Sequence, residues 1–268
     1  MADPELPAQP TTEPGAALEG ALVAPDEGST MSVVDHLAEL RQRLVICVLA
    51  LLAASVFGFI VAPQVLTLLA SPLGYPLQII SVGGGFFVQL KLALIVGLAI
   101  SLPIILFQLW HFVSPGLTPR ERSVARPWLP LGAIFFGVGL VVAYLVLPFA
   151  LGFLSSFAVP GVSENHWTLE AYFDFVLLLF LAFGVVMEFP IVLVLLVRLH
   201  LLSLERLRAN RRYAILIIVI FAVVITPGGD PISPSIMSIV MYALYEITIQ
   251  LLSRAERSAT AAAAPGSG

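Results

Sequence analysis

Hydrophobic side chains dominate the chain in long runs that short polar segments separate. Six such runs cover roughly residues 44–62, 88–113, 128–154, 171–199, 213–226 and 235–252. A helix that crosses a bilayer core of about 30 Å needs about 20 mainly apolar residues. Four runs are long enough, whereas the fifth would form a helix of only about 21 Å, and the sixth is also short. The pattern predicts an all-α polytopic membrane protein with six transmembrane helices, the last two short.

The connection between the fifth and sixth runs, residues 227–231, is rich in proline and glycine and leaves two interpretations open. Two short crossings would require local thinning of the bilayer or packing against longer helices. A re-entrant hairpin is the alternative. Arg211 and Arg212 before the fifth run and Arg254 after the sixth favour two crossings.

Basic residues lie at alternate ends of the six runs. The loops 63–87, 155–170 and 227–234 contain no Lys or Arg, and Lys91 is the only basic residue outside the following set. The set comprises Arg41, Arg43, Arg120, Arg122, Arg126, Arg198, Arg206, Arg208, Arg211, Arg212, Arg254 and Arg257. Because positive residues stay on the cytoplasmic side, both termini are expected to be cytoplasmic.

The two ends of the chain differ from the membrane domain, which is predicted to cover residues 31–257. Residues 1–30 carry acidic but no basic side chains and no periodic apolar pattern, so a disordered acidic tail is expected. Residues 258–268 are expected to form a disordered C-terminal tail. At 32–43 the apolar residues recur with helical spacing, which predicts an amphipathic helix in the cytoplasmic interface that leads into the first span.

Composition agrees with a membrane protein and gives no sign of catalysis. The chain is 59% hydrophobic and 11% charged, whereas soluble domains are about 25% charged. The net charge of −4 arises from the acidic tail. The sequence has no phosphate-binding loop, zinc-protease motif or nucleophile elbow, and the single Cys47 excludes an intrachain disulfide. We expect no catalytic residue, no metal or other cofactor, and no nucleic-acid partner.

Glu188 stands out because it lies deep in the fourth run, about 15 Å of helix before Arg198. A charged group near the bilayer midplane is costly and usually faces a bundle interior or a wet cavity. Glu188 is therefore a candidate functional residue. The alternative is a protonated side chain hydrogen-bonded to a neighbouring helix.

Other polar residues in the runs have weaker functional signals. Glu246, in the sixth run, could be neutralised by Arg254 or solvated by headgroups. Gln108 and Lys91 lie in the second run, and Lys91 is close enough to the far interface to snorkel.

Two carboxylates occupy cytoplasmic segments. Thr118, Pro119 and Glu121 form a capping box that would start the third helix, and from physics alone this role is favoured. The functional alternative is that Glu121 accepts hydrogen bonds from an incoming guanidinium, a pairing that favours Arg over Lys. Glu39 on the amphipathic helix offers a second carboxylate of this kind.

Several segments resemble the C subunit of the twin-arginine translocase, the TatC family, over about residues 31–257. The similar segments are 36–44 (HLAELRQRL), 71–73 (SPL), 107–117 (FQLWHFVSPGL) with 120–122 (RER), 183–190 (FGVVMEFP), 226–227 (TP) and 241–246 (MYALYE). The resemblance implies the core receptor of a machine that exports folded proteins across the bacterial cytoplasmic (inner) membrane, driven by the proton-motive force. It implies that twin-arginine signal peptides are its ligands.

The resemblance also implies partners and residue roles. Glu39 and Glu121 would engage the paired arginines, which reverses the physical preference for a bland role of the two carboxylates. Arg41 would belong to the same signal-peptide site. Glu188 would line a concave groove and contact a partner's transmembrane helix. The further residues implied are Gln108 and Glu246 as intramembrane polar groups and Pro72, Phe112 and Asp230 as structural or loop positions. Implied partners are TatA- and TatB-type single-span subunits, precursor proteins, the lipid bilayer and other copies of this chain, as a homo-oligomer within a hetero-oligomeric complex.

The sequence departs from the family's pattern at two places, and one alternative function is open. The connection 226–230 is one residue longer than the family's common form, and Pro234 stands where many relatives have Gln. The alternative function is a proton-coupled secondary transporter of small solutes with Glu188 as the coupling residue. The spans lack the paired interruptions that would mark a midplane solute site, which speaks against it.

Overall fold

The computed structural model describes residues 33–116, 118, 122, 128–159 and 167–263. The chain divides into two compact units, Met1–Glu39 and Leu40–Gly268, and their boundary lies inside the first helix. The described part of the first unit is helical from Val33. The second unit holds the remaining helices.

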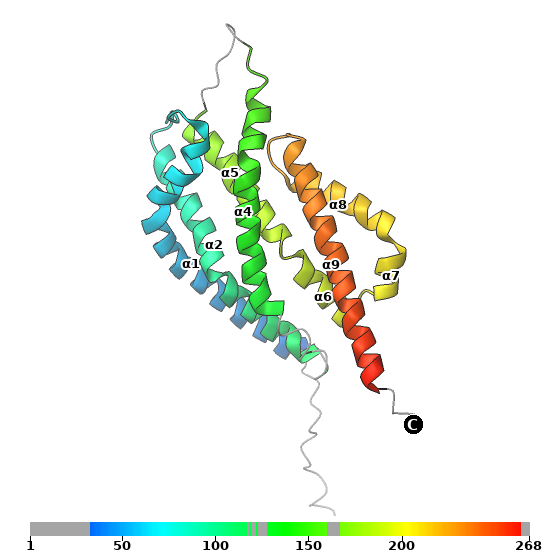
Figure 1. Ribbon diagram of the computed structural model, residues 1–268. Helices are drawn as coiled ribbons and strands as arrows, with labels where there is room; N and C mark the ends of the chain where they lie inside the picture. Colours follow the sequence, from blue (N-terminus) through cyan, green and yellow to red (C-terminus); the bar gives the residue numbers. More distant parts are fainter. Residues whose placement is uncertain (1–32, 117, 119–121, 123–127, 160–166, 264–268) are drawn as a thin grey trace, which may run out of the picture. The chain divides into compact units, whose positions relative to one another are not determined.

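The described residues are almost entirely helical (Figure 1). The only β-type pairing among them is an isolated bridge between Gln78 and Thr168. The helices are α1 (Val33–Ala70), η1 (Ser71–Leu73), α2 (Gly84–Val113), η2 (Ser114–Gly116), α4 (Trp128–Ser155), α5 (Leu169–Val186), α6 (Phe189–Arg198), α7 (Leu204–Ala209), α8 (Arg211–Ile225) and α9 (Ile232–Ala263). The predicted all-α class is confirmed.

Five helical segments among the described residues are long and apolar enough to cross a membrane. They are His36–Leu73, Gly84–Gly116, Pro130–Ser155, Leu169–Arg198 and Ile232–Ala255. Helix α8, which corresponds to the predicted fifth span, has only 15 residues. A sixth crossing by α8 therefore stays a prediction.

The last helix is longer than its apolar run indicated. Helix α9 has 32 residues, so the prediction that the last two helices are both short is wrong for α9. Its run, 235–252, is extended at one end by residues from Ile232 and at the other by polar and alanine-rich residues up to Ala263. Alanine is the strongest helix former, so a helix continues where hydrophobicity ends.

The amphipathic segment and the first span form one continuous helix, α1. This helix also passes through Pro63 and ends at Ala70, beyond the end of the first apolar run. The placement of residues 32–43 in the membrane interface stays a prediction.

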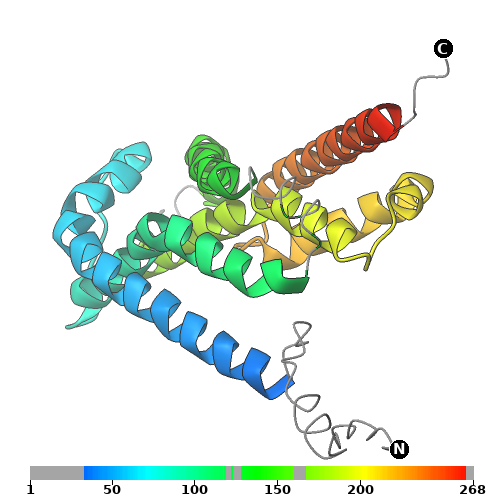
Figure 2. The same ribbon diagram turned by 90° about the horizontal axis from the view of Figure 1, so that it is seen from below.

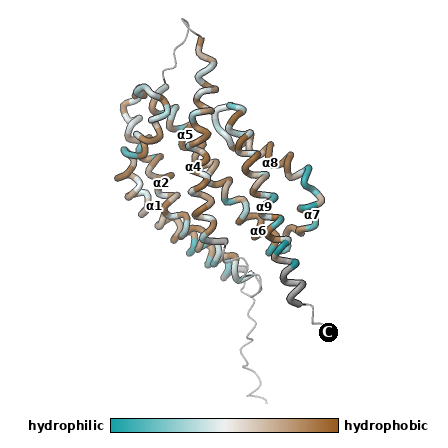
Figure 3. The backbone as a smooth tube through the Cα atoms, in the orientation of Figure 1, coloured by the Kyte–Doolittle hydropathy of each residue, from teal (hydrophilic) through white to brown (hydrophobic). Residues whose placement is uncertain are grey.

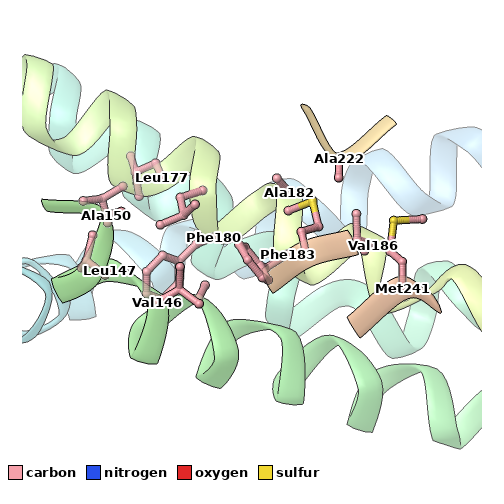
Figure 4. Packing of buried hydrophobic residues seen from close by; sticks show 14 of the residues in the cluster. Val146, Leu147, Ala150, Leu177, Phe180, Ala182, Phe183, Val186, Ala222 and Met241 are labelled. Carbon is pink, nitrogen blue, oxygen red and sulfur yellow. The ribbon is translucent and has the colours of Figure 1, made fainter. Parts of the chain in front are cut away.

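The core of the second unit lies where α4 packs against α5. Val146, Leu147 and Ala150 of α4 face Leu177 and Phe180 of α5, and all five are buried (Figure 4). Helix α4 also contacts α2 and α9, so it occupies a central position in this unit (Figures 1 and 2). Most residues of the neighbouring spans are hydrophobic as well (Figure 3), as lipid contact requires.

Small residues allow the helices to approach closely. A Cβ on Gly139 of α4 would lie 2.6 Å from the carbonyl oxygen of Phe183 on α5. A Cβ on Gly58 of α1 would lie 2.5 Å from the carbonyl oxygen of Ala93 on α2. Such crossings are typical of membrane helices, which associate by close packing rather than by exclusion of water.

Candidate functional site

The predicted fourth span is two helices, and Glu188 lies in the interruption between them. Helix α5 ends at Val186 and α6 begins at Phe189. Pro190 causes the break, because it has no N–H to donate and disfavours helical geometry in the preceding residue. The chain tightens there, and the N–H of Glu188 donates to the carbonyl of Val185 at 3.1 Å.

The Glu188 carboxylate faces a glycine of α4. Both carboxylate oxygens are buried and have no hydrogen-bond partner among the described residues. A Cβ on Gly132 would lie 2.8 Å from Oε2 of Glu188 and 2.5 Å from Leu106 of α2. The absent side chain at Gly132 therefore makes the room that Glu188 occupies. The alternative interpretation of Glu188 was a hydrogen bond to a neighbouring helix. No such bond is seen among the described residues.

Gln108 joins the first two spans. Its Oε1 accepts a hydrogen bond from Nη1 of Arg43 at 3.2 Å. This contact connects the start of the apolar part of α1 to the last two turns of α2. Gln108 thus has a structural partner of its own.

Glu246 pairs with Arg211, and not with Arg254, one of the two alternatives that the sequence left open. Nε of Arg211 lies 2.9 Å from Oε1 of Glu246, and its Nη2 donates to Oε2 at 3.1 Å. The hydroxyl of Tyr242 also donates to Oε1, at 3.3 Å. Arg211 begins α8, whereas Arg254 follows Glu246 on the same helix. The tertiary contact between α8 and α9 therefore decides the pairing.

Lys91 has a protein partner and does not depend on snorkelling. Its Nζ donates to Oδ1 of Asp174 on α5 at 2.6 Å, and both side chains are half-exposed. Asp174 begins the second turn of α5, which brings it level with Lys91 on α2. The pair neutralises two charges that would be costly in apolar surroundings.

The residues expected to bind the signal peptide are only partly described. Glu39 ends the first unit, and its Oε2 lies 3.7 Å from Nδ1 of His36 one turn earlier. Arg41 is exposed on α1. Glu121 lies outside the described residues. Whether these three side chains form one site stays a prediction.

The three expected structural positions lie at helix ends. Asp230 is buried, and its Oδ1 accepts a hydrogen bond from the N–H of Ser233 at 2.7 Å. Asp230 thus caps α9, despite the longer connection that precedes it. Pro72 lies in η1, and Phe112 lies in the last turn of α2.

Sequence reasoning missed three residues of these polar contacts: Arg211 as the partner of Glu246, Asp174 as the partner of Lys91, and Gly132 opposite Glu188. The first two pairs join residues 35 and 83 positions apart, so no local sequence pattern predicts them. Pro190 was the available signal for the interruption at Glu188, because proline within a helical run marks a break or kink.

Comparison with known proteins places the chain in a family. A family model described as "Sec-independent protein translocase protein (TatC)" matches residues 35–239. A TatC protein of Carboxydothermus hydrogenoformans is 36% identical over 227 residues, which cover 83% of this chain and 93% of that protein. The TatC protein of Escherichia coli is 34% identical, over 82% of this chain and 87% of its own length.

A solved structure agrees with the sequence matches. The crystal structure of a twin-arginine translocase receptor, TatC, in the detergent DDM superposes with a TM-score of 0.69 at 34% identity. The match covers 81% of this chain and 98% of that one. These likenesses support the translocase over the small-solute transporter. The chain therefore belongs to the TatC family of Sec-independent protein translocase proteins, as a multi-pass membrane protein.

Proposed function

We propose that this chain is the receptor subunit that binds twin-arginine signal peptides and forms the scaffold for the export of folded proteins. The observation that carries this proposal is the likeness to a TatC receptor structure over 81% of the chain. The proton-motive force would supply the driving energy, because the sequence has no nucleotide-binding loop.

The proposed peptide site uses Glu39 and Glu121 as acceptors for the two guanidinium groups. A carboxylate binds Arg through two parallel hydrogen bonds, which Lys cannot reproduce. Arg41, exposed on α1, would favour the acidic or polar groups of the peptide. Glu121 can also cap a helix with one oxygen, so the two roles of this residue are compatible.

Binding of a precursor with Arg-Arg tests the peptide site directly. A photocrosslinker at residue 39 or 121 should capture the Arg-Arg precursor and capture a Lys-Lys precursor much less. Binding should fall at least tenfold with Glu121→Ala and less with Glu121→Asp, which keeps the charge. Equal capture of the two precursors would contradict the proposed role of these residues in binding the signal peptide.

We propose that Glu188 contacts a transmembrane helix of a TatA- or TatB-type subunit. The support is its carboxylate, which has no hydrogen-bond partner among the described residues. A donor from a partner helix would offset the cost of keeping this group in an apolar environment. Copurification of a TatB-type subunit should weaken with Glu188→Ala and be better preserved with Glu188→Gln. Unchanged copurification of both variants would contradict the contact.

Gln108 and Glu246 have a narrower proposed role in partner binding. Each already has a partner, Arg43 and Arg211 respectively. They would shape the surfaces that partner subunits meet by holding α2 and α9 in place. Other copies of this chain would join the same complex.

The proposed location is the bacterial cytoplasmic membrane with both termini in the cytoplasm and six crossings, α8 included. The support is the arginine distribution, because Arg198, Arg206 and Arg211 all lie near the connections around α7. Membrane-impermeant thiol reagents should label a cysteine at Glu205 only from the cytoplasmic side. Labelling from the outside would contradict this topology.

Deletion of residues 2–30 should leave export intact.

A further inference from the structure

The connection between η1 and α2, together with the first turn of α2, exposes a group of large apolar side chains, here named the apolar tip. It consists of Ile79, Ile80, Val82, Phe86 and Phe87. Ile79 is 62% exposed, Ile80 is 75% exposed and Val82 is fully exposed. Residues 63–87 contain no charged side chain. An uncharged loop with this much apolar exposure is unusual in contact with water.

The structure holds the apolar tip outward. The N–H of Gln78 donates to the carbonyl of Trp167 at 3.2 Å, and the N–H of Leu169 donates to the carbonyl of Gln78 at 2.8 Å. Ser81 donates to the Glu170 carboxylate on α5. These bonds fix the backbone on both sides of Ile79 and Ile80. The two side chains therefore cannot fold inward without breaking them.

The tip continues the lipid-facing surface of the spans. The ring of Phe86 packs edge-on against Phe59 of α1, with centroids 6.3 Å apart, and against Phe87 at 5.7 Å. Phe59 on α1 and Leu90 on α2 are themselves exposed within the spans. Exposed apolar side chains of membrane spans are covered by acyl chains. Phe86 lies one helical turn before Leu90 on α2, so this covered surface continues along one face of the helix to Phe86.

Two observations argue for a tip in water. The first is Glu170, whose carboxylate lies beside the tip, but it accepts the hydrogen bond from Ser81 and can stay at headgroup level. The second is the Lys91–Asp174 pair. Lys91 and Asp174 lie farther into the spans, because Lys91 is about 10 Å of helix beyond Gly84. A membrane boundary drawn at this pair would leave the tip outside. The two charges, however, neutralise each other at 2.6 Å. The apolar side chains of the tip have no comparable compensation in water.

We propose that the apolar tip inserts into the bilayer, in the leaflet opposite the arginine-rich ends of the spans. Its partner is the lipid itself, the upper acyl chains and glycerol region of phospholipids. Insertion anchors the α1–α2 connection and sets the depth of these two helices in the membrane.

A fluorescent depth measurement tests this proposal on the full-length protein. A single cysteine replaces Ile80 in a Cys47→Ala background, carries the environment-sensitive dye NBD, and is placed in nanodiscs of phosphatidylcholine and phosphatidylglycerol. Lipids brominated near the top of the acyl chain should quench the dye at least twofold. Leu145→Cys on α4, which is 61% exposed within a segment long and apolar enough to cross a membrane, is the lipid-facing control. Glu205→Cys on α7 is the aqueous control.

Each alternative gives a different signal. Emission at the water wavelength, as for the Glu205→Cys control, would overturn insertion. A shielded dye that brominated lipids do not quench would mean contact with protein, from a second copy, and would also overturn it. Shielding that requires added partner subunits would overturn it in the same way. A second protein carries Ile80→Leu and has the dye on a cysteine that replaces Ile79. Brominated lipids should quench this dye as well.

Discussion

Arg211 and Glu246 form an ion pair, 2.9 Å between Nε and Oε1, that joins the first turn of α8 to α9. The hydroxyl of Tyr245 donates to the carbonyl of Leu207 at 2.7 Å, and Arg208 donates to Ser253. Together these contacts form a polar seam between α9 and the segment of α7 and α8. Hydrophilic residues gather in this region in Figure 3. The seam orients α8, which is too short to be placed by hydrophobic length alone.

Removal of Glu246 should weaken the seam. Glu246→Ala leaves Arg211 without its partner, and because Arg211 is half-exposed the expected loss of stability is about 1 kcal/mol. Thermal unfolding in detergent measures this loss. Arg212→Gln is the matched control, because Arg212 stacks on the Tyr213 ring instead. A double-mutant cycle with Arg211→Gln should show a coupling energy; a coupling of zero would mean that the pair contributes nothing.

Gly132→Ala should disturb Glu188, because the added methyl group would enter the space that the carboxylate occupies. The new methyl group would meet Leu106 at 2.5 Å, Ile191 at 2.6 Å and Glu188 at 2.8 Å. These atoms are the ends of flexible side chains that can shift aside, so the overpacking should cost about 1 kcal/mol, the low end of its usual range. Gly137→Ala is the control on the same helix, because nothing lies within 4 Å of its added Cβ. Thermal stability and export of a reporter precursor should both fall for Gly132→Ala only. Equal behaviour of the two variants would refute the tight packing.

The Lys91–Asp174 pair should matter most when only one partner is removed. Lys91→Ala leaves an unpaired carboxylate within the spans, and because both side chains are half-exposed the expected cost is about 1 kcal/mol. The double variant Lys91→Ala/Asp174→Ala should be more stable than either single variant, because it leaves no unpaired charge. Thermal unfolding in nanodiscs distinguishes these variants. The pairing argument fails if the two single losses simply add.

Asp230 should stabilise α9 as its N-cap. Asp230→Ala removes the acceptor for the N–H of Ser233, and loss of such a cap costs about 1 kcal/mol. Asp230→Asn keeps an acceptor oxygen and should lose less. Hydrogen–deuterium exchange at the start of α9 is the local measurement. Faster exchange is expected for Asp230→Ala and near-normal exchange for Asp230→Asn.

Hydrophobic periodicity predicted the class of the protein and the approximate positions of its spans. Apolar runs correspond to helices α1, α2, α4, α5 with α6, α8 and α9, because a bilayer accepts only segments whose backbone bonds are internal. The helix ends were less predictable. Residues 63–70 and 253–263 are helical although they lie outside the apolar runs, since helix continues wherever the backbone is unobstructed.

The candidate polar residues were recognisable one at a time. Glu188, Glu246 and Lys91 stand out because charged residues are rare in apolar runs. Their partners did not stand out, because a partner is chosen by how two helices meet. Glu246 has Arg254 two turns away on its own helix and still pairs with Arg211.

By itself, the sequence determined that the chain is helical, that it resides in the membrane, and which carboxylates are unusual there. Those properties depend on local composition and spacing. The tertiary structure alone decided that Gly132 makes room for Glu188, that Asp174 neutralises Lys91, and that a fixed backbone at Gln78 holds the apolar tip outward. Each of these depends on the distance between side chains or backbone atoms of different segments, which is set by close packing between helices and not by the residues on either side along the chain.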